Sequence, residues 1–259
     1  TNNIENMRNN LSQMISLSKI EEKLYRPADA YELSRVTRME HVKTTIVETP
    51  QEGIKAVATR IAQLINRREA NGQKTVLSLA SGRSMRDLFV ELVRLHKEEG
   101  LSFKNVVVFG SYEFYPLSDT TSGSMAQIQS QLLEHVDILP ENVHTFPGDL
   151  PKEDVFAFCE EYEKAIVEAG GIDVQVLGIG QCGNIAMNEP GTQPNSSTRL
   201  VIMDGNSRVD VKSLFGHATQ VPTCAITLGV ETILQAKEVI LLAFGQHKAG
   251  IVKQAIEEV

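Results

Sequence analysis

The sequence predicts an α/β fold, in which a doubly wound, mainly parallel sheet carries helices on both faces. From about Thr44, short β-branched runs alternate with longer stretches of helical periodicity. Several of the short runs are apolar at consecutive positions, which is typical of strands covered by helices on both faces. No internal repeat or low-complexity linker divides this part of the chain. We therefore expect an N-terminal helical extension over 1–43 and one α/β domain over 44–259.

The N-terminal extension has the pattern of an amphipathic helix. Apolar residues recur at helical spacing from Ile4 to Leu24 among Asn, Ser and charged residues. Pro27 interrupts the pattern, and a second short helical stretch follows. We interpret the extension as an arm that docks on the main body or on a neighbouring subunit. A frayed tail is the alternative.

The α/β domain begins with a strand and a long helix. The helix places Pro50 in its first turn, where the missing proline N–H has no intrahelical partner to lose, and has an apolar stripe from Ile54 to Ile65. The expected strands are TTIVE (44–48), KTVLSLA (74–80), KNVVVFG (104–110), IDVQVLGIG (172–180), TRLVIM (198–203), CAITLG (224–229) and EVILLAF (238–244). The expected helices span 50–69, 84–98, 122–135, 151–169 and 247–258.

Composition excludes several classes of protein. The chain has 25 Lys and Arg against 33 Asp and Glu, a formal charge of −8, and no basic run that would bind a nucleic-acid backbone. Its apolar runs are far shorter than the roughly 18 residues that a membrane-spanning helix needs. The three Cys are widely spaced, which fits neither a disulfide framework nor a zinc site, and the polar start resembles no signal peptide. We expect a cytoplasmic protein without nucleic-acid, membrane or metal partners.

Three strand ends have the composition of ligand sites, as expected at the carboxyl edge of a parallel sheet. After the strand 74–80, Ser81, Gly82, Arg83 and Ser84 combine a tight turn, hydroxyls, a positive charge and the free N–H groups of a helix start, which suits a phosphate. An ordinary capped turn is the alternative. The segment 178–191 has three glycines in six residues. Lys248 lies near the start of the last helix, where a cation is unfavourable unless an anion binds.

Longer motifs make the chain resemble the glucosamine-6-phosphate deaminase/isomerase family. They are FVELVRLHKEEGLSFKNVVVF, GIGxxGxIAxNEPG at 178–191, SSTRL ending at Leu200, VPTCAITLGVETIL at 221–234 and FGQHKAG at 244–250. The resemblance covers about residues 44–259. It implies a Rossmann-like fold, a small phosphorylated sugar as ligand, no metal, no organic cofactor and a homo-oligomer. The implied reaction opens the ring of glucosamine 6-phosphate, shifts a proton between C2 and C1, and releases ammonia to give fructose 6-phosphate.

The chain departs from this family where protons are transferred. The family's F-N-x-D-E-Y reads FGSYEF here, so that Tyr112 replaces the base and Glu113 is retained beside it. The family's D-G-H-I-A-F-N-E-P reads CGNIAMNEP, so that Cys182 and Asn184 replace the relay Asp and the ring-opening His, while Glu189 remains. A tyrosine would need its pKa lowered by about three units to act as a base at neutral pH. Glu113 could substitute only if its side chain turned toward the sugar.

The altered residues allow other interpretations. Cys182 could bring thiol chemistry to the relay position, or it could simply fill the space that the Asp left. His247 is better interpreted as an exposed or helix-capping histidine than as a replacement base.

The phosphate-binding side is better preserved. Ser81, Gly82, Arg83 and Ser84 correspond to the family's T-G-S-T loop, and Lys248 corresponds to its phosphate lysine. The family's phosphate arginine aligns with Ser213, next to Lys212, so Arg83 would supply the missing charge. This pattern predicts a protein that binds a phosphorylated sugar with weak or absent deaminase activity. The alternatives are an active deaminase or isomerase that uses Glu113 and Glu189, and a non-catalytic assembly protein with a vestigial site.

Overall fold

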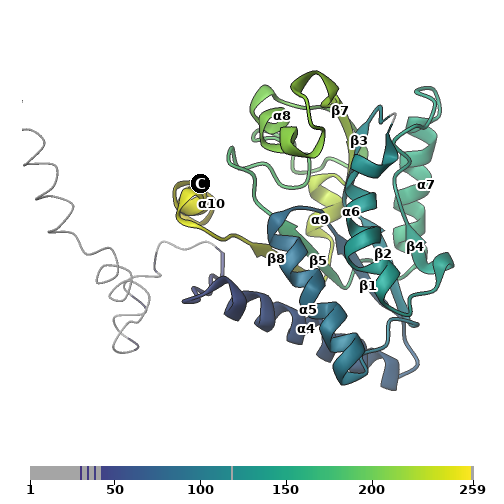
Figure 1. Cartoon of the computed structure of the whole chain (residues 1–259), viewed down its shortest axis with the longest axis vertical. Coiled ribbons are helices and arrows are strands. Elements are labelled where there is room, and N and C mark those ends of the chain that lie inside the picture. Colours follow the sequence, from purple (N-terminus) through teal and green to yellow (C-terminus); the bar gives the residue numbers. More distant parts are fainter. Residues whose placement is uncertain (1–29, 31–33, 35–37, 39–41, 118, 258–259) are drawn as a thin grey trace, which may run out of the picture. The chain divides into compact units, whose positions relative to one another are not determined.

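A five-stranded parallel sheet is the central feature of residues 50–252, which form one compact unit of the chain (Figure 1). The computed structural model describes residues 42–117 and 119–257 and the single residues 30, 34 and 38. The strand order is β4-β2-β1-β5-β8, and every neighbouring pair is parallel. The strands are β1 (Thr75–Leu79), β2 (Val106–Gly110), β4 (Val143–His144), β5 (Val174–Gly178) and β8 (Glu238–Leu242).

The central strands are buried along their whole length. Every residue of β1 and β2 is buried, which explains why their sequences are continuous apolar runs rather than alternating ones. Parallel register places Leu79 beside Gly110 and Val176, so β1, β2 and β5 end at the same edge. The predicted α/β fold with a mainly parallel sheet is confirmed, and the polar loops after these strands meet at one edge.

A second, three-stranded antiparallel sheet corrects part of the strand prediction. It has the order β3-β7-β6, with β3 (Tyr112–Tyr115), β6 (Arg199–Ile202) and β7 (Cys224–Thr227). The runs at 198–203 and 224–229 therefore do not join the parallel sheet but pair with each other. The strand β3 was not expected, because only Ser111 separates it from the end of β2.

The predicted helices are confirmed, with shifted ends and one interruption. The helices α4 (Pro50–Ala70) and α5 (Arg83–Glu99) pack side by side, α4 against β1 and α5 against β5 (Figure 1). The expected helix over 122–135 consists of a turn η1 (Thr120–Ser122), α6 (Ser124–Gln131) and a turn η2 (Leu133–His135). The remaining helices are α7 (Val155–Glu168), α8 (Gly205–Val211), α9 (Val230–Leu234) and α10 (Ala249–Glu257), and further short turns are η3 (Pro140–Asn142), η4 (Lys212–Leu214), η5 (Ala218–Gln220) and η6 (Gln246–Lys248).

The strand expected at 44–48 is wrong, because residues 43–47 adopt neither helix nor strand. Val42 and Ile46 are about half exposed, so this β-branched run lacks the cover that a buried strand needs. The helical arm expected over 1–43 lies almost entirely outside the described residues. The division at residue 43 therefore stays a prediction.

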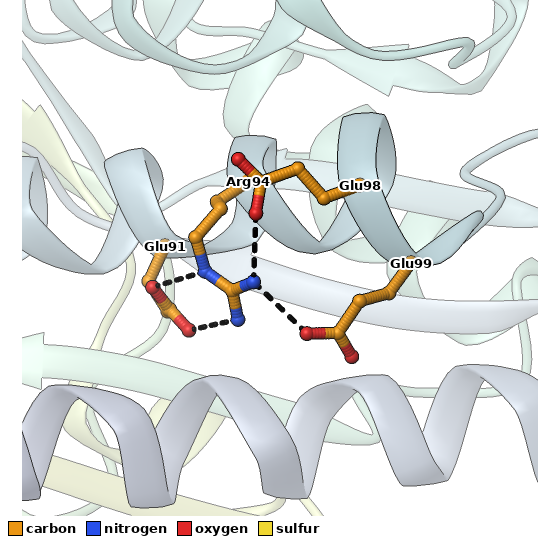
Figure 2. Close-up of polar contacts among 4 residues, drawn as sticks. All are labelled: Glu91, Arg94, Glu98 and Glu99. Atoms are coloured by element: carbon orange, nitrogen blue, oxygen red, sulfur yellow. Dashed lines mark hydrogen bonds and ion pairs between the residues drawn. The ribbon is translucent and has the colours of Figure 1, made fainter.

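One face of α5 carries a network of ion pairs around a half-buried arginine (Figure 2). Arg94 donates to both oxygens of Glu91, at 3.0 and 2.7 Å, and its Nη1 also donates to Glu98 at 3.1 Å and Glu99 at 2.9 Å. These pairs raise the pKa of Arg94, chiefly through the hydrogen bonds to Glu91. Arg94 thereby neutralises acidic side chains near the helix C-terminus, where the macrodipole disfavours negative charge.

No helix among residues 42–117 and 119–257 is long and apolar enough to cross a membrane.

Candidate functional site

The turn between β1 and α5 has the geometry of an anion-binding helix start. Gly82 precedes the first helical residue with φ 132°, a backbone conformation that favours glycine, and its carbonyl accepts the N–H of Met85 and Arg86 at 3.1 and 3.0 Å. The earlier N–H groups of a helix have no partner within it. Ser81 and Ser84 are half-buried in this turn, and Arg83 is exposed. The turn therefore combines free donors with one positive charge.

Tyr112 joins this turn to the second sheet. Its hydroxyl lies 2.8 Å from Oγ of Ser81, although the residue as a whole is only 7% exposed. Burial raises the pKa of Tyr112, and the negative charge of Glu113 raises it further, against the hydrogen bond to Ser81. The phenol is therefore neutral at pH 7 and can donate or accept a hydrogen bond, but it is a poor base.

Glu113 points away from that turn, toward the start of α6. Its Oε1 accepts the N–H of Phe114 and Ser124, both at 2.8 Å, and its Oε2 accepts the N–H of Met125 at 2.9 Å. Both carboxylate oxygens are thus occupied by backbone donors, and the residue is 3% exposed. Burial raises the pKa of Glu113, and the three N–H donors oppose this shift. The carboxylate caps α6, so it has no free oxygen for a ligand.

The loop after β5 is held by the lysine that precedes α10. Nζ of Lys248 donates to the carbonyl of Ile179 at 2.8 Å, and Lys248 ends the short turn η6 that follows Gly245. The Asn184 side chain folds back over Gly180, where any Cβ would collide with its amide oxygen. Its Nδ2 donates to the Ala186 carbonyl at 3.4 Å. Asn184 therefore closes its own loop.

Four side chains around this loop interact electrostatically. Partial burial lowers the pKa of Lys248, Asp210 and Cys182 raise it, and Arg83 lowers it. Asp210 also accepts the N–H of Gln181 through Oδ2 at 3.4 Å. Arg83, Asp210 and Cys182 thus lie near enough to Lys248 for their charges to shift its pKa, and Cys182 is half-buried.

Glu189 contacts the start of α8, whereas three other residues considered from the sequence are exposed. Oε1 of Glu189 accepts the N–H of Asp204, immediately before α8, at 3.2 Å. Lys212 and Ser213 are both exposed on η4, and His247 is exposed on η6. Glu189 is half-buried, and the Asp204 N–H occupies its Oε1. Its expected acid–base role stays a prediction.

Asp210 is the residue of this site that sequence reasoning missed. It lies on α8, an element that was not predicted, near the arginine position that aligns with Ser213. The start of α8 is indicated in the sequence by Asp204, a residue type that favours the N-cap. In the structure Asp204 is the N-cap and accepts the N–H of Asn206 at 2.8 Å. The D-G-N sequence at 204–206 therefore marks the helix start, but nothing in the sequence places Asp210 beside Lys248.

Among residues 42–117 and 119–257, no group of three His, Cys, Asp or Glu side chains is placed to hold a metal ion. Cys159 is buried within α7, and burial raises the pKa of its thiol to about 11. Neither observation adds a ligand to the site. The site thus consists of the Ser81–Ser84 turn, the 178–184 loop, Tyr112, Asp210 and Lys248.

Comparison with known proteins gives consistent results. The model of the family described as glucosamine-6-phosphate isomerases/6-phosphogluconolactonase matches residues 48–259. A glucosamine-6-phosphate deaminase-like protein of Bacteroides thetaiotaomicron is 44% identical over 252 residues, which cover 97% of this chain but 38% of that protein. The glucosamine-6-phosphate deaminase of Bacillus pumilus is 39% identical, over 74% of this chain and 79% of the relative.

Solved structures extend the similarity to the fold. A monomeric glucosamine-6-phosphate deaminase superposes with a TM-score of 0.77 at 31% identity, over 82% of this chain and 86% of that one. The 6-phosphogluconolactonase of Thermotoga maritima superposes with a TM-score of 0.61 at 20% identity, over 78% and 84% of the two chains, which shows a shared fold alone.

Proposed function

Because the chain belongs to the glucosamine-6-phosphate isomerase/6-phosphogluconolactonase family, we propose that it binds a phosphorylated amino sugar with weak or absent deaminase activity. One observation carries the proposal: the residue at the family's base position, Tyr112, is a buried neutral phenol hydrogen-bonded to Ser81. The Tyr112 hydroxyl therefore contacts the Ser81–Ser84 turn, where we place the phosphate, but it cannot replace the missing base.

Binding is supported by the charges at the site. Lys248 contacts the 178–184 loop, the charge of Arg83 acts on Lys248, and the free N–H groups at the start of α5 add partial positive charge. Partial burial of Lys248 strengthens its attraction for an anion, because fewer water molecules screen it. The phosphate of the sugar would lie between the Ser81–Ser84 turn and Lys248.

Loss of proton transfer is supported by three positions. Tyr112 cannot accept a proton at neutral pH, and Asn184 has no proton to exchange. Cys182 stands where the family has its relay carboxylate. Each missing acid–base group typically costs about a hundredfold to ten-thousandfold in rate, although such losses do not add independently.

Two other functions make different predictions. An active deaminase would need Glu113 and Glu189 to share the proton transfers, but both oxygens of Glu113 accept backbone N–H groups. An assembly protein with a vestigial site would bind no sugar phosphate. The expected homo-oligomer and cytoplasmic location stay predictions, of which gel filtration tests the first.

The test is a thermal-shift titration with glucosamine 6-phosphate, run beside a coupled assay for ammonia release. We expect a rise in melting temperature without ammonia above background. Arg83→Ala and Lys248→Ala should each weaken binding about tenfold or more, as loss of a charged hydrogen bond does. Lys164→Ala, which removes an exposed lysine from α7, is the matched control and should leave binding unchanged. Ammonia release at the rate of an active deaminase would contradict the proposal, as would equal ligand shifts in all variants.

A further inference from the structure

Asp210 places a carboxylate against the loop that Lys248 contacts. Its Oδ2 accepts the N–H of Gln181 at 3.4 Å, and two residues earlier the carbonyl of Ile179 accepts from Nζ of Lys248 at 2.8 Å. Two backbone groups of the same loop therefore bind the two side chains: the N–H of Gln181 binds the carboxylate, and the carbonyl of Ile179 binds the ammonium group. Of the charges that act on Lys248, Asp210 has the largest effect, ahead of Arg83.

The charges of the site make Asp210 important for the charge state of the ligand. Arg83 and Lys248 contribute two positive charges and Asp210 one negative charge, so the side chains together carry one net positive charge, to which the N–H groups at the start of α5 add roughly half a charge. A phosphate monoester carries about −1.5 to −2 at pH 7, since its second pKa is about 6. A site meant for the dianion would gain affinity without the carboxylate. The carboxylate therefore shifts the preference of the site toward the monoanion, which keeps one P–O–H group.

The hydrogen-bonding chemistry points in the same direction. An ionised carboxylate only accepts hydrogen bonds, and the P–O–H of a phosphate monoanion is a donor that needs an acceptor. Such a charge-assisted bond is stronger than one between neutral groups. A sulfate ester also carries one negative charge, but it has no proton between pH 5 and 8 and would only be repelled by Asp210.

We propose that Asp210 is a specificity-determining residue that accepts a hydrogen bond from the protonated phosphate, so that the site selects phosphate monoesters, as their monoanions, over sulfate esters. This inference rests on the proposed function, because it assumes that the phosphorylated sugar binds between Arg83 and Lys248. To the proposed function it adds that the ligand is a phosphate ester rather than a sulfate ester and that it binds as the monoanion.

Other ionisable groups lie near Lys248, and their effect on binding must be separated from that of the ligand. Among the described residues, Arg83 on α5, Cys182 on the 178–184 loop and Asp210 on α8 are the groups whose charges act on Lys248. His247 is next to Lys248 on η6, and its ring lies against Gly245. A sulfate ester reports the titration of these protein groups alone, because the ester itself stays singly charged.

The experiment compares glucosamine 6-phosphate with glucosamine 6-sulfate by calorimetry at about pH 7.5 and pH 5.5. The monoanion fraction of the phosphate rises on the order of twentyfold over this interval, since the second pKa is about 6. We expect wild-type affinity for the phosphate to rise by that order, and affinity for the sulfate to stay within about twofold. Asp210→Asn keeps an acceptor for the Gln181 N–H but removes the charge.

In Asp210→Asn we expect the pH dependence for the phosphate to disappear and the preference over the sulfate to shrink on the order of tenfold. Asp154→Asn, which removes the same charge from an exposed position before α7, should behave as wild type. An unchanged pH profile in Asp210→Asn, or equal tightening for both esters, would overturn this inference and leave the proposed function standing. Failure of every protein to bind either ester at either pH would overturn both.

Discussion

At the residue scale, the chemistry depends on whether the side chain at the family's base position can accept a proton. For Tyr112 this would need a pKa near 7, about three units below its ordinary value, or roughly 4 kcal/mol of differential stabilisation. The structure shifts the pKa in the opposite direction, because the phenol is buried and lies near the charge of Glu113. The hydroxyl instead contacts Ser81 and can help to orient the phosphate turn.

Replacing Glu113 by Gln tests whether this residue is structural. The amide places an NH₂ group against a backbone N–H that the carboxylate now accepts, either that of Met125 or those of Phe114 and Ser124. We expect Glu113→Gln to lower the free energy of unfolding by about 2 kcal/mol, as buried unsatisfied donors do. The rise in melting temperature caused by glucosamine 6-phosphate should persist.

The same substitution has a predicted pH dependence. Burial raises the pKa of Glu113 in the folded protein, so folding favours the protonated carboxyl. The stability that this contributes is fully present below the unfolded pKa of about 4.3. It is lost as the pH rises through the folded pKa. The stability advantage of wild type over Glu113→Gln should therefore be larger near pH 4 than near pH 7.5 in urea unfolding. Glu161→Gln, an exposed change on α7, is the control. Ammonia release that disappears in a fully stable Glu113→Gln would contradict the structural role.

At the scale of elements, the turn from β1 into α5 depends on Gly82. Its φ of 132° is unfavourable for any residue with a Cβ, although no atom lies within 4 Å of where that Cβ would be. We expect Gly82→Ala to cost about 1–3 kcal/mol of stability through backbone strain and also to weaken phosphate binding. Ligand titrations at a temperature where both proteins are folded measure the second effect.

Gly72→Ala separates strain from binding. Gly72 follows α4 with φ 67° and also has open space around its Cβ position, but it lies outside the site. It should lose stability without losing affinity. If Gly82→Ala binds glucosamine 6-phosphate as tightly as Gly72→Ala does, the turn does not contribute to the phosphate site.

Some helices and strands could be predicted from the sequence and others could not. The strands β1, β2, β5 and β8 and the helices α4 and α5 were predictable, because their apolar runs and stripes are set by local burial. The second sheet was not, since β6 and β7 have compositions that would also suit a parallel strand. Which partner such a strand chooses depends on non-local packing. The run at 44–48 has the composition of a strand but is not buried by other elements, and composition alone does not show whether a segment is buried.

Part of the site was also accessible from the sequence. Strand ends identified the Ser81–Ser84 turn, the 178–184 loop and Lys248. In the structure Lys248 contacts that loop, and the charges of Arg83 and Cys182 act on the pKa of Lys248. The direction of Glu113 was not predictable, because adjacent residues of a strand point to opposite faces and either could have faced the sugar. Asp210 required the three-dimensional packing of α8 on the loop.

At the scale of the whole molecule, a formal charge of −8 opposes the binding of any anion. The chain must therefore concentrate positive charge locally, and Arg83 and Lys248 do so at the start of α5 and on η6. Because Asp210 reduces this local charge, it disfavours a dianion more than a monoanion. The acidic background thus favours a ligand of low charge held by specific hydrogen bonds.

A time course of ³¹P NMR spectra of glucosamine 6-phosphate with a stoichiometric amount of the protein measures binding and turnover in the same sample. We expect the phosphate resonance to shift or broaden while no second resonance grows. Steady growth of the fructose 6-phosphate resonance would contradict the loss of deaminase activity, and a resonance unchanged by the protein would contradict binding.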